Sequence, residues 1–207
     1  SGEADLDAPS GYTVAFDQSP INKSVVDAGD PTFTITGGET GATYTYEVTS
    51  SSTSEKATGT GTMTAADEEI AIPKADLSVF EDGDLLILSV TLEDAVGNLN
   101  SAPAKVGVAY DITPPTPTLA TETPFSTSQN PIRISVSFTE TVSNVDANDF
   151  VTTNATVALV QTGVSQGPVV LFDVAPIAQD EVSITLPAGA VTDVGQNPSN
   201  VSNTLLF

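Results

Sequence analysis

Two consecutive prolines, Pro114 and Pro115, stand near the middle of this chain. Proline has no backbone N–H and a nearly fixed φ, so strand pairing stops at such a pair and the backbone stays extended. The residues in front of it, Asp111 to Thr113, therefore belong to a stiff linker. With 207 residues, the chain is long enough for two domains that each bury a core of their own. The double proline predicts the boundary between them.

The segment before the double proline has a counterpart at the N-terminus. Asp5, Asp7 and Pro9 introduce the first half of the chain as Asp111 and Pro114 introduce the second. This recurrence indicates two similar domains, each preceded by an acidic, proline-containing segment. The predicted parts are residues 1–9 as a leader with a tag remnant and linker, 10–111 as the first domain, and 112–207 as the second.

Short runs of alternating apolar and polar residues recur through both halves with the period of a β-strand. The clearest runs cover residues 85–92 and 132–138. Turn signals separate the runs, and only one helical turn is predicted, at residues 75–80. The pattern predicts an all-β chain of two tandem β-sandwich domains of about 100 residues each, joined by a short proline-containing linker. The alternatives are a single large β-barrel or a jelly roll, which the double proline disfavours.

The charge balance narrows the range of partners. The chain has 27 acidic and five basic residues and a net charge of -22. Such a charge repels phosphate backbones and anionic lipids, so we expect no nucleic-acid partner, and no apolar run is long enough for membrane insertion. Cations are the expected partners. The alternative reading is that acidity merely keeps the protein soluble.

The residue types also argue against catalysis. The chain contains no histidine and no cysteine, so the usual nucleophile–base pairs and zinc ligands are absent. It has carboxylates enough for a glycosidase but no tryptophan to form a sugar platform. No glycine-rich phosphate loop follows a strand and opens a helix. We predict that the protein is not an enzyme.

Strand counting predicts where the acidic loops converge. In a seven-strand sandwich, the loops after the second and sixth strands return to the end where the chain enters. Calcium prefers six to eight oxygen ligands, such as the carboxylate, amide and carbonyl oxygens of these loops. Magnesium favours a tighter octahedron in which it keeps several water ligands. The alternative is that the acidic and asparagine residues of these loops are ordinary turn residues. The predicted metal ligands are Asp7, Glu39, Asp94 and Asn98 in the first domain, and Asp111, Glu140, Asp193 and Asn197 at the junction, with Asp82 and Asp84 reaching the junction ion.

Short motifs stand at residues 88–98, at the junction 111–115, and at residues 136–142 and 186–193. These stretches resemble bacterial Ig-like repeats of large secreted adhesins. The resemblance implies Ig-like sandwiches that extend or display a surface protein, often with calcium between repeats. The family pattern Asp-x-x-Gly-Asn stands intact at residues 94–98, whereas we expect the second copy, at 193–197, to carry one inserted residue.

Two non-catalytic functions follow from this resemblance. The first is a calcium-stiffened extender for cell adhesion at a bacterial surface, secreted and monomeric, with calcium and neighbouring repeats as partners. The alternative is a ligand-binding module for carbohydrate, ice or a host protein. A binder needs a grouped aromatic or apolar surface, and the only candidates, Phe80 and Phe125, are isolated.

Overall fold

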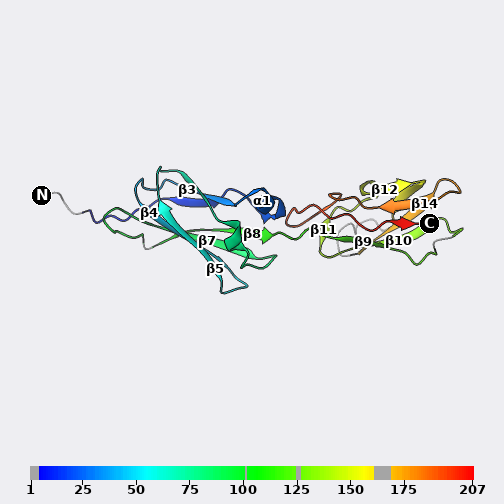
Figure 1. Cartoon of the computed structure of the whole chain (residues 1–207), viewed down its shortest axis with the longest axis horizontal. Helices are drawn as coiled ribbons and strands as arrows, with labels where there is room; N and C mark the ends of the chain where they lie inside the picture. Colours follow the sequence, from blue (N-terminus) through cyan, green and yellow to red (C-terminus); the bar gives the residue numbers. More distant parts are fainter. Residues whose placement is uncertain (1–4, 101, 125–126, 161–168) are drawn as a thin grey trace. The chain divides into compact units, whose positions relative to one another are not determined.

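The computed structural model describes residues 5–100, 102–124, 127–160 and 169–207. The chain divides into two compact units, unit 1 (Ser1–Ile112) and unit 2 (Thr113–Phe207). Both are built from strands (Figure 1), which confirms the all-β prediction. Residues 1–4 of the predicted leader and Phe125 lie outside the described part. The independent folding of each unit, with domain boundaries at residues 10–111 and 112–207, remains a prediction.

Unit 1 contains a three-stranded sheet and a five-stranded sheet. Its elements are β1 (Thr13–Phe16), β2 (Ile21–Asn22), α1 (Lys23–Ala28), β3 (Thr32–Thr36), β4 (Thr43–Ser50), β5 (Lys56–Thr62), β6 (Glu68–Ala71), α2 (Lys74–Leu77), β7 (Leu85–Glu93) and β8 (Ala104–Asp111). The strand orders are β1-β3-β6 and β2-β8-β7-β4-β5. Neighbours are antiparallel except β2 and β8, which pair in parallel.

The core of unit 1 lies between these two sheets. The alternation predicted for residues 85–92 is confirmed, because Leu86, Leu88 and Val90 on β7 are fully buried. From the opposite sheet, Phe33 meets Tyr46 edge to face, with ring centroids 5.3 Å apart. Burial of such side chains removes apolar surface from water and holds the two sheets together.

The glycines of β5 make room for two tyrosines. Gly59 pairs with Tyr46 and Gly61 pairs with Tyr44 across the β4–β5 ladder. A methyl group added at either glycine would clash with the ring of the tyrosine opposite. The small residues of this strand therefore let both rings lie flat across it, although glycine lowers the intrinsic stability of a strand.

Helix α1 was not predicted from the sequence, which indicated a single helical turn, at residues 75–80. The Asn22 side chain accepts a hydrogen bond from the backbone N–H of Val25 at 3.2 Å and so caps the helix. Lys23 and Asp27 form an ion pair one turn apart at 2.9 Å. Helix α2 supplies the single turn expected near residues 75–80, beginning one residue earlier. No helix within the described ranges is long and apolar enough to span a membrane.

Unit 2 contains a four-stranded sheet, a three-stranded sheet and a short two-stranded ladder. Its elements are β9 (Pro117–Ala120), β10 (Ile132–Phe138), β11 (Val142–Ser143), η1 (Ala147–Asp149), β12 (Val151–Thr153), β13 (Ala155–Leu159), β14 (Val169–Pro176), β15 (Ser183–Thr185), β16 (Thr192–Asp193) and β17 (Leu205–Leu206). The orders are β13-β14-β10-β9, β12-β15-β17 and β11-β16, all antiparallel. Phe172 lies at the centre of the core, edge to face with Phe150 at 4.8 Å.

Strand β9 was not predicted from the sequence, and its outer edge is closed by one side chain. The backbone N–H of Leu119 donates to Asn203 Oδ1 at 2.8 Å, and Asn203 Nδ2 donates to the Leu119 carbonyl at 2.9 Å. The asparagine amide thus replaces a strand partner at this position. It satisfies both backbone groups of Leu119 that a neighbouring strand would otherwise bond.

Candidate metal centre

A compact acidic loop follows β7 in unit 1. Asp94 Oδ1 accepts hydrogen bonds from the backbone N–H groups of Val96 and Asn98 at 2.9 and 2.8 Å, and Asp94 Oδ2 accepts one from Asn98 Nδ2 at 2.7 Å. Gly97 completes the turn with a φ of 95°. Burial of Asp94 acts to raise its pKa, but the hydrogen bonds from Asn98, Val96 and Gly97 outweigh that effect and lower the pKa below its usual range.

The loop at residues 193–197 repeats this arrangement in unit 2. Asp193 Oδ1 accepts from the Asn197 N–H at 2.8 Å, and Asp193 Oδ2 accepts from Asn197 Nδ2 at 3.1 Å. Gln196 takes the place of Gly97, with a φ of 62°. The expected insertion is therefore wrong: the glycine has moved to position 195 while the spacing from Asp to Asn is unchanged.

Two carboxylates of unit 2 come close together at this loop. Glu140 and Asp193 each offer a ligand oxygen, and these oxygens lie within 4.8 Å of one another. The ladder between β11 and β16 is the cause, because it pairs Val142 with Asp193 and so holds the residues just before β11 beside the loop. Asp193 is 4% exposed and Asn197 is fully buried, whereas Glu140 is half-buried.

Asp111 ends β8, the last strand of unit 1, two residues before unit 2 begins. It is half-buried and pairs with Asn22 in the parallel β2–β8 ladder. The chain that follows is held by Asp82, whose Oδ1 accepts a hydrogen bond from the Ile112 N–H at 2.6 Å. Asp82 thus bonds the backbone at Ile112, the last residue of unit 1.

Asp84 serves the structure of its own loop. Its Oδ2 accepts hydrogen bonds from the Ser50 hydroxyl at 2.7 Å and from the Glu81 N–H at 3.0 Å. Hydrogen bonds from Ser52 and Ser50 lower the pKa of this buried carboxyl, and burial opposes them. The carboxylate therefore ties the loop after α2 to the end of β4.

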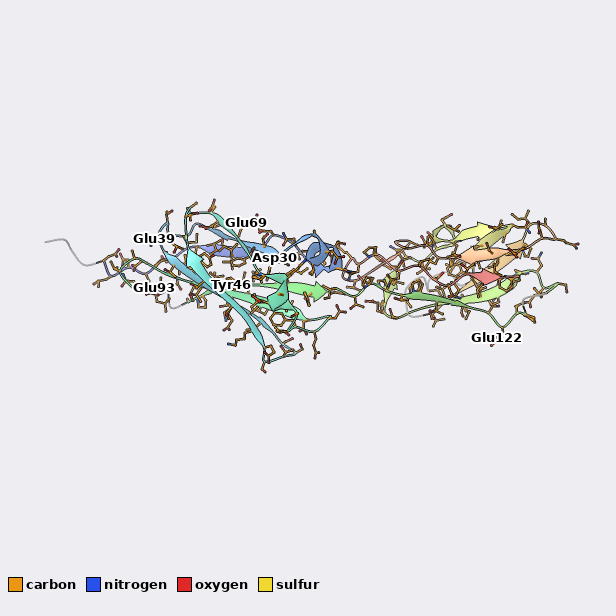
Figure 2. The ribbon with its side chains drawn as sticks, viewed as in Figure 1. Asp30, Glu39, Tyr46, Glu69, Glu93 and Glu122 are labelled. Atoms are coloured by element: carbon orange, nitrogen blue, oxygen red, sulfur yellow. The ribbon has the colours of Figure 1, made fainter. Side chains whose placement is uncertain are left out.

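The ligands predicted for unit 1 do not form a comparable group. Glu39 and Glu93 lie at the same end of the unit (Figure 2), but Asp7 and Glu39 are both exposed. Among the described residues of unit 1, no three carboxylates bring their oxygens within 4.8 Å of one another. The contact that the structure does make there is different: Asn98 Nδ2 donates to the Asp5 carbonyl at 3.1 Å.

The comparisons with solved structures find repeat domains of large bacterial adhesins among the structural neighbours. One is a segment of a bacterial ice-binding adhesin retained at its host cell surface, 15% identical, with a TM-score of 0.44, covering 95% of this chain and 64% of that one. A tandem-repeat segment from the extending region of a large adhesion protein is 15% identical, with a TM-score of 0.40 and coverages of 97% and 50%. A Ca2+-stabilised adhesin with which an Antarctic bacterium binds ice is 20% identical, with a TM-score of 0.39 and coverages of 96% and 49%.

This chain thus spans between about half and two thirds of the neighbours' own lengths. No protein-family model matches it, and neither does any curated protein.

Two asparagines near the loops were missed by the sequence prediction. Asn100 Nδ2 donates to the Pro9 carbonyl at 2.6 Å, and in unit 2 the Asn200 N–H donates to the Pro115 carbonyl at 2.9 Å. Both prolines are buried. The signal in the sequence was an asparagine two or three residues after each Asp–Asn loop, matched by a proline at the end of each preceding segment.

Proposed function

We propose that this chain is a non-catalytic extender of a large bacterial surface adhesin and that calcium stiffens it. The absence of histidine, cysteine and tryptophan from the sequence supports a role without catalysis. The large exposed apolar side chains among the described residues are valines, leucines and isoleucines, with no aromatic ring among them. Phe80, one of the two candidates for an exposed binding surface, is only 6% exposed. These features favour an extender over a ligand-binding module.

The observation that carries the calcium proposal is the approach of Glu140 to Asp193. Their ligand oxygens lie within 4.8 Å of one another, and two negative charges at this distance repel. The burial of Asp193 strengthens the repulsion, because water screens it less. A bound cation removes the repulsion. Calcium fits best, since it takes carboxylate, carbonyl and water oxygens at about 2.3–2.6 Å in flexible geometry.

Asp111 is the proposed third ligand. The argument rests on the repetition of the two units: Asp5 stands four residues before the buried Pro9, and Asp111 stands four residues before the buried Pro115. In unit 1 the backbone at Asp5 lies beside the Asp–Asn loop, where Asn98 bonds it. By this equivalence we expect the carboxylate of Asp111 to serve as the third ligand beside Glu140 and Asp193.

An ion held in this way would stiffen the linker. The double proline limits how the backbone bends, and the ion would tie the residue in front of the prolines to the loops of unit 2. Extracellular calcium modules bind with dissociation constants of about 10⁻⁴–10⁻³ M, so such a joint is suited to a protein on the outside of a cell.

Small-angle scattering tests the stiffening. In about 10 mM calcium, which exceeds the dissociation constants usual for extracellular sites, we expect a larger maximum dimension and a narrower range of conformations than in excess chelator. The Glu140→Gln variant should scatter like the chelated protein in both solutions. Identical wild-type profiles with and without calcium would exclude a calcium-dependent joint.

A further inference from the structure

The segment in front of unit 1 is held by asparagine side chains. Asn98 Nδ2 donates to the carbonyl of Asp5 at 3.1 Å, and Asn100 Nδ2 donates to the carbonyl of Pro9 at 2.6 Å. The first and last residues of the 5–9 segment are thus bonded to two positions of the same loop. Pro9 is buried, whereas Asp5 and Asp7 remain exposed.

Both asparagines are fixed in the orientation that donates to the segment. Asn100 Oδ1 accepts the Ala102 N–H at 2.7 Å, which directs Nδ2 toward Pro9. Asn98 Nδ2 lies between two acceptors, Asp94 Oδ2 and the Asp5 carbonyl, so only the amide nitrogen fits there. The Asp94 carboxylate, itself bonded by three donors of its loop, therefore positions Asn98 for the segment.

This geometry opposes the use of Asn98 as a metal ligand. An asparagine binds calcium through its carbonyl oxygen, because the amide nitrogen has no lone pair to offer. Turning the Asn98 amide toward an ion would break its bonds to both Asp94 and Asp5. Within unit 1, moreover, the described carboxylates form no group of three that approaches within 4.8 Å.

We propose that the loop of residues 94–100 is a binding site for the extended segment 5–9, and that it holds this segment without a metal ion. The site recognises two backbone carbonyls and a buried proline, so it fits an extended, proline-ended peptide. In unit 2 the Pro115 carbonyl is bonded differently, by the backbone N–H of Asn200, while Asn200 Nδ2 donates to Thr116 Oγ1, both at 2.9 Å.

Backbone NMR order parameters of the whole chain in excess chelator test the clamp. For the wild type we expect residues 6–8 to be nearly as ordered as the strands, with S² of about 0.8. In Asn98→Ala the start of the segment should loosen to an S² below about 0.6, while Asn100→Ala should loosen its end. Asn98→Asp, which cannot donate, should behave like Asn98→Ala. The control Asn148→Ala, at an exposed position of unit 2, should leave the segment ordered.

Two results would overturn the clamp. One is a segment equally ordered in Asn98→Ala, Asn100→Ala and the wild type, with the rest of unit 1 folded in each. The other is a wild-type segment that is mobile in chelator and becomes ordered only when calcium is added. Because the clamp concerns unit 1 in chelator and the proposed calcium centre concerns residues of unit 2 in calcium, either proposal can fail without the other.

Discussion

Replacing Phe172 by alanine is expected to unfold unit 2 at conditions where unit 1 remains intact. Phe172 is fully buried, pairs with Ile134 across the β10–β14 ladder and contacts the ring of Phe150. Removing a buried phenylalanine side chain costs about 3–5 kcal/mol, a large part of the stability of a unit of this size. Each unit has its own core cluster, so we expect the loss to be confined to unit 2.

The tyrosines make this separation measurable. All four of them, Tyr12, Tyr44, Tyr46 and Tyr110, lie in unit 1, and the chain has no tryptophan. Tyrosine fluorescence therefore follows unit 1 alone, whereas far-ultraviolet circular dichroism follows both units. Phe172→Ala should lower the urea midpoint of part of the dichroism signal and leave the fluorescence midpoint in place.

The matched control is Leu88→Ala in unit 1, which should lower the fluorescence midpoint instead. Leu88 is fully buried on β7, and its truncation costs about 2–5 kcal/mol. If both variants moved the two signals together, the units would not fold independently and the two-domain prediction would be wrong.

Replacing Glu140 by glutamine is expected to change stability in opposite directions with and without calcium. In chelator the variant should melt at a higher temperature than the wild type, because it removes one of two neighbouring negative charges. In calcium it should melt at a lower temperature, because a charged ligand of the ion is lost. The Asp193 loop stays intact, since its hydrogen bonds come from Asn197.

Glu122→Gln is the control for this variant. Glu122 is exposed in unit 2 (Figure 2), and its substitution makes the same change in charge. The melting temperature of Glu122→Gln should rise on addition of calcium by as much as that of the wild type. If Glu140→Gln kept the full response to calcium, Glu140 would not be a ligand.

Much of the fold was predictable from local patterns in the sequence. The alternation in residues 85–92 and 132–138 is typical of strands with one buried face. Both runs form interior strands of their sheets, β7 and β10. Helix α1 was missed because it has only six residues, and its two apolar side chains on the core, Val25 and Val26, are adjacent and only partly buried. Strand β9 was missed because its four residues begin with proline, and its edge partner is a side chain 84 residues away.

The candidate site was predictable only as far as strand counting reached. Counting places Glu140 and Asp193 in loops at the same end, and the structure brings their oxygens within 4.8 Å. It could not show that the two-residue strands β11 and β16 set their register, since so short a ladder has no sequence period. Nor could it show that Gln196 adopts the left-handed backbone of Gly97, because that region is rare for residues other than glycine.

The role of Asp84 illustrates a different limit. A carboxylate in a turn can bind an ion, face solvent or organise its own loop. The neighbouring residues in the sequence do not distinguish these three roles, because tight turns select the same residue types in each. The deciding partner of Asp84 is Ser50, which lies 34 residues earlier in the chain. Long-range hydrogen bonds of this kind depend on the completed fold.

Thermal unfolding of the wild-type chain in calcium and in excess chelator tests the proposed calcium centre most directly. At a calcium concentration about 100 times the dissociation constant, binding to the folded state alone adds about 2.7 kcal/mol. For a unit of about 100 residues this should raise the melting temperature of unit 2 by roughly 10–20 °C, while the tyrosine signal of unit 1 moves much less. Magnesium at the same concentration should produce a smaller rise. Superimposable unfolding curves in calcium and chelator would contradict the account.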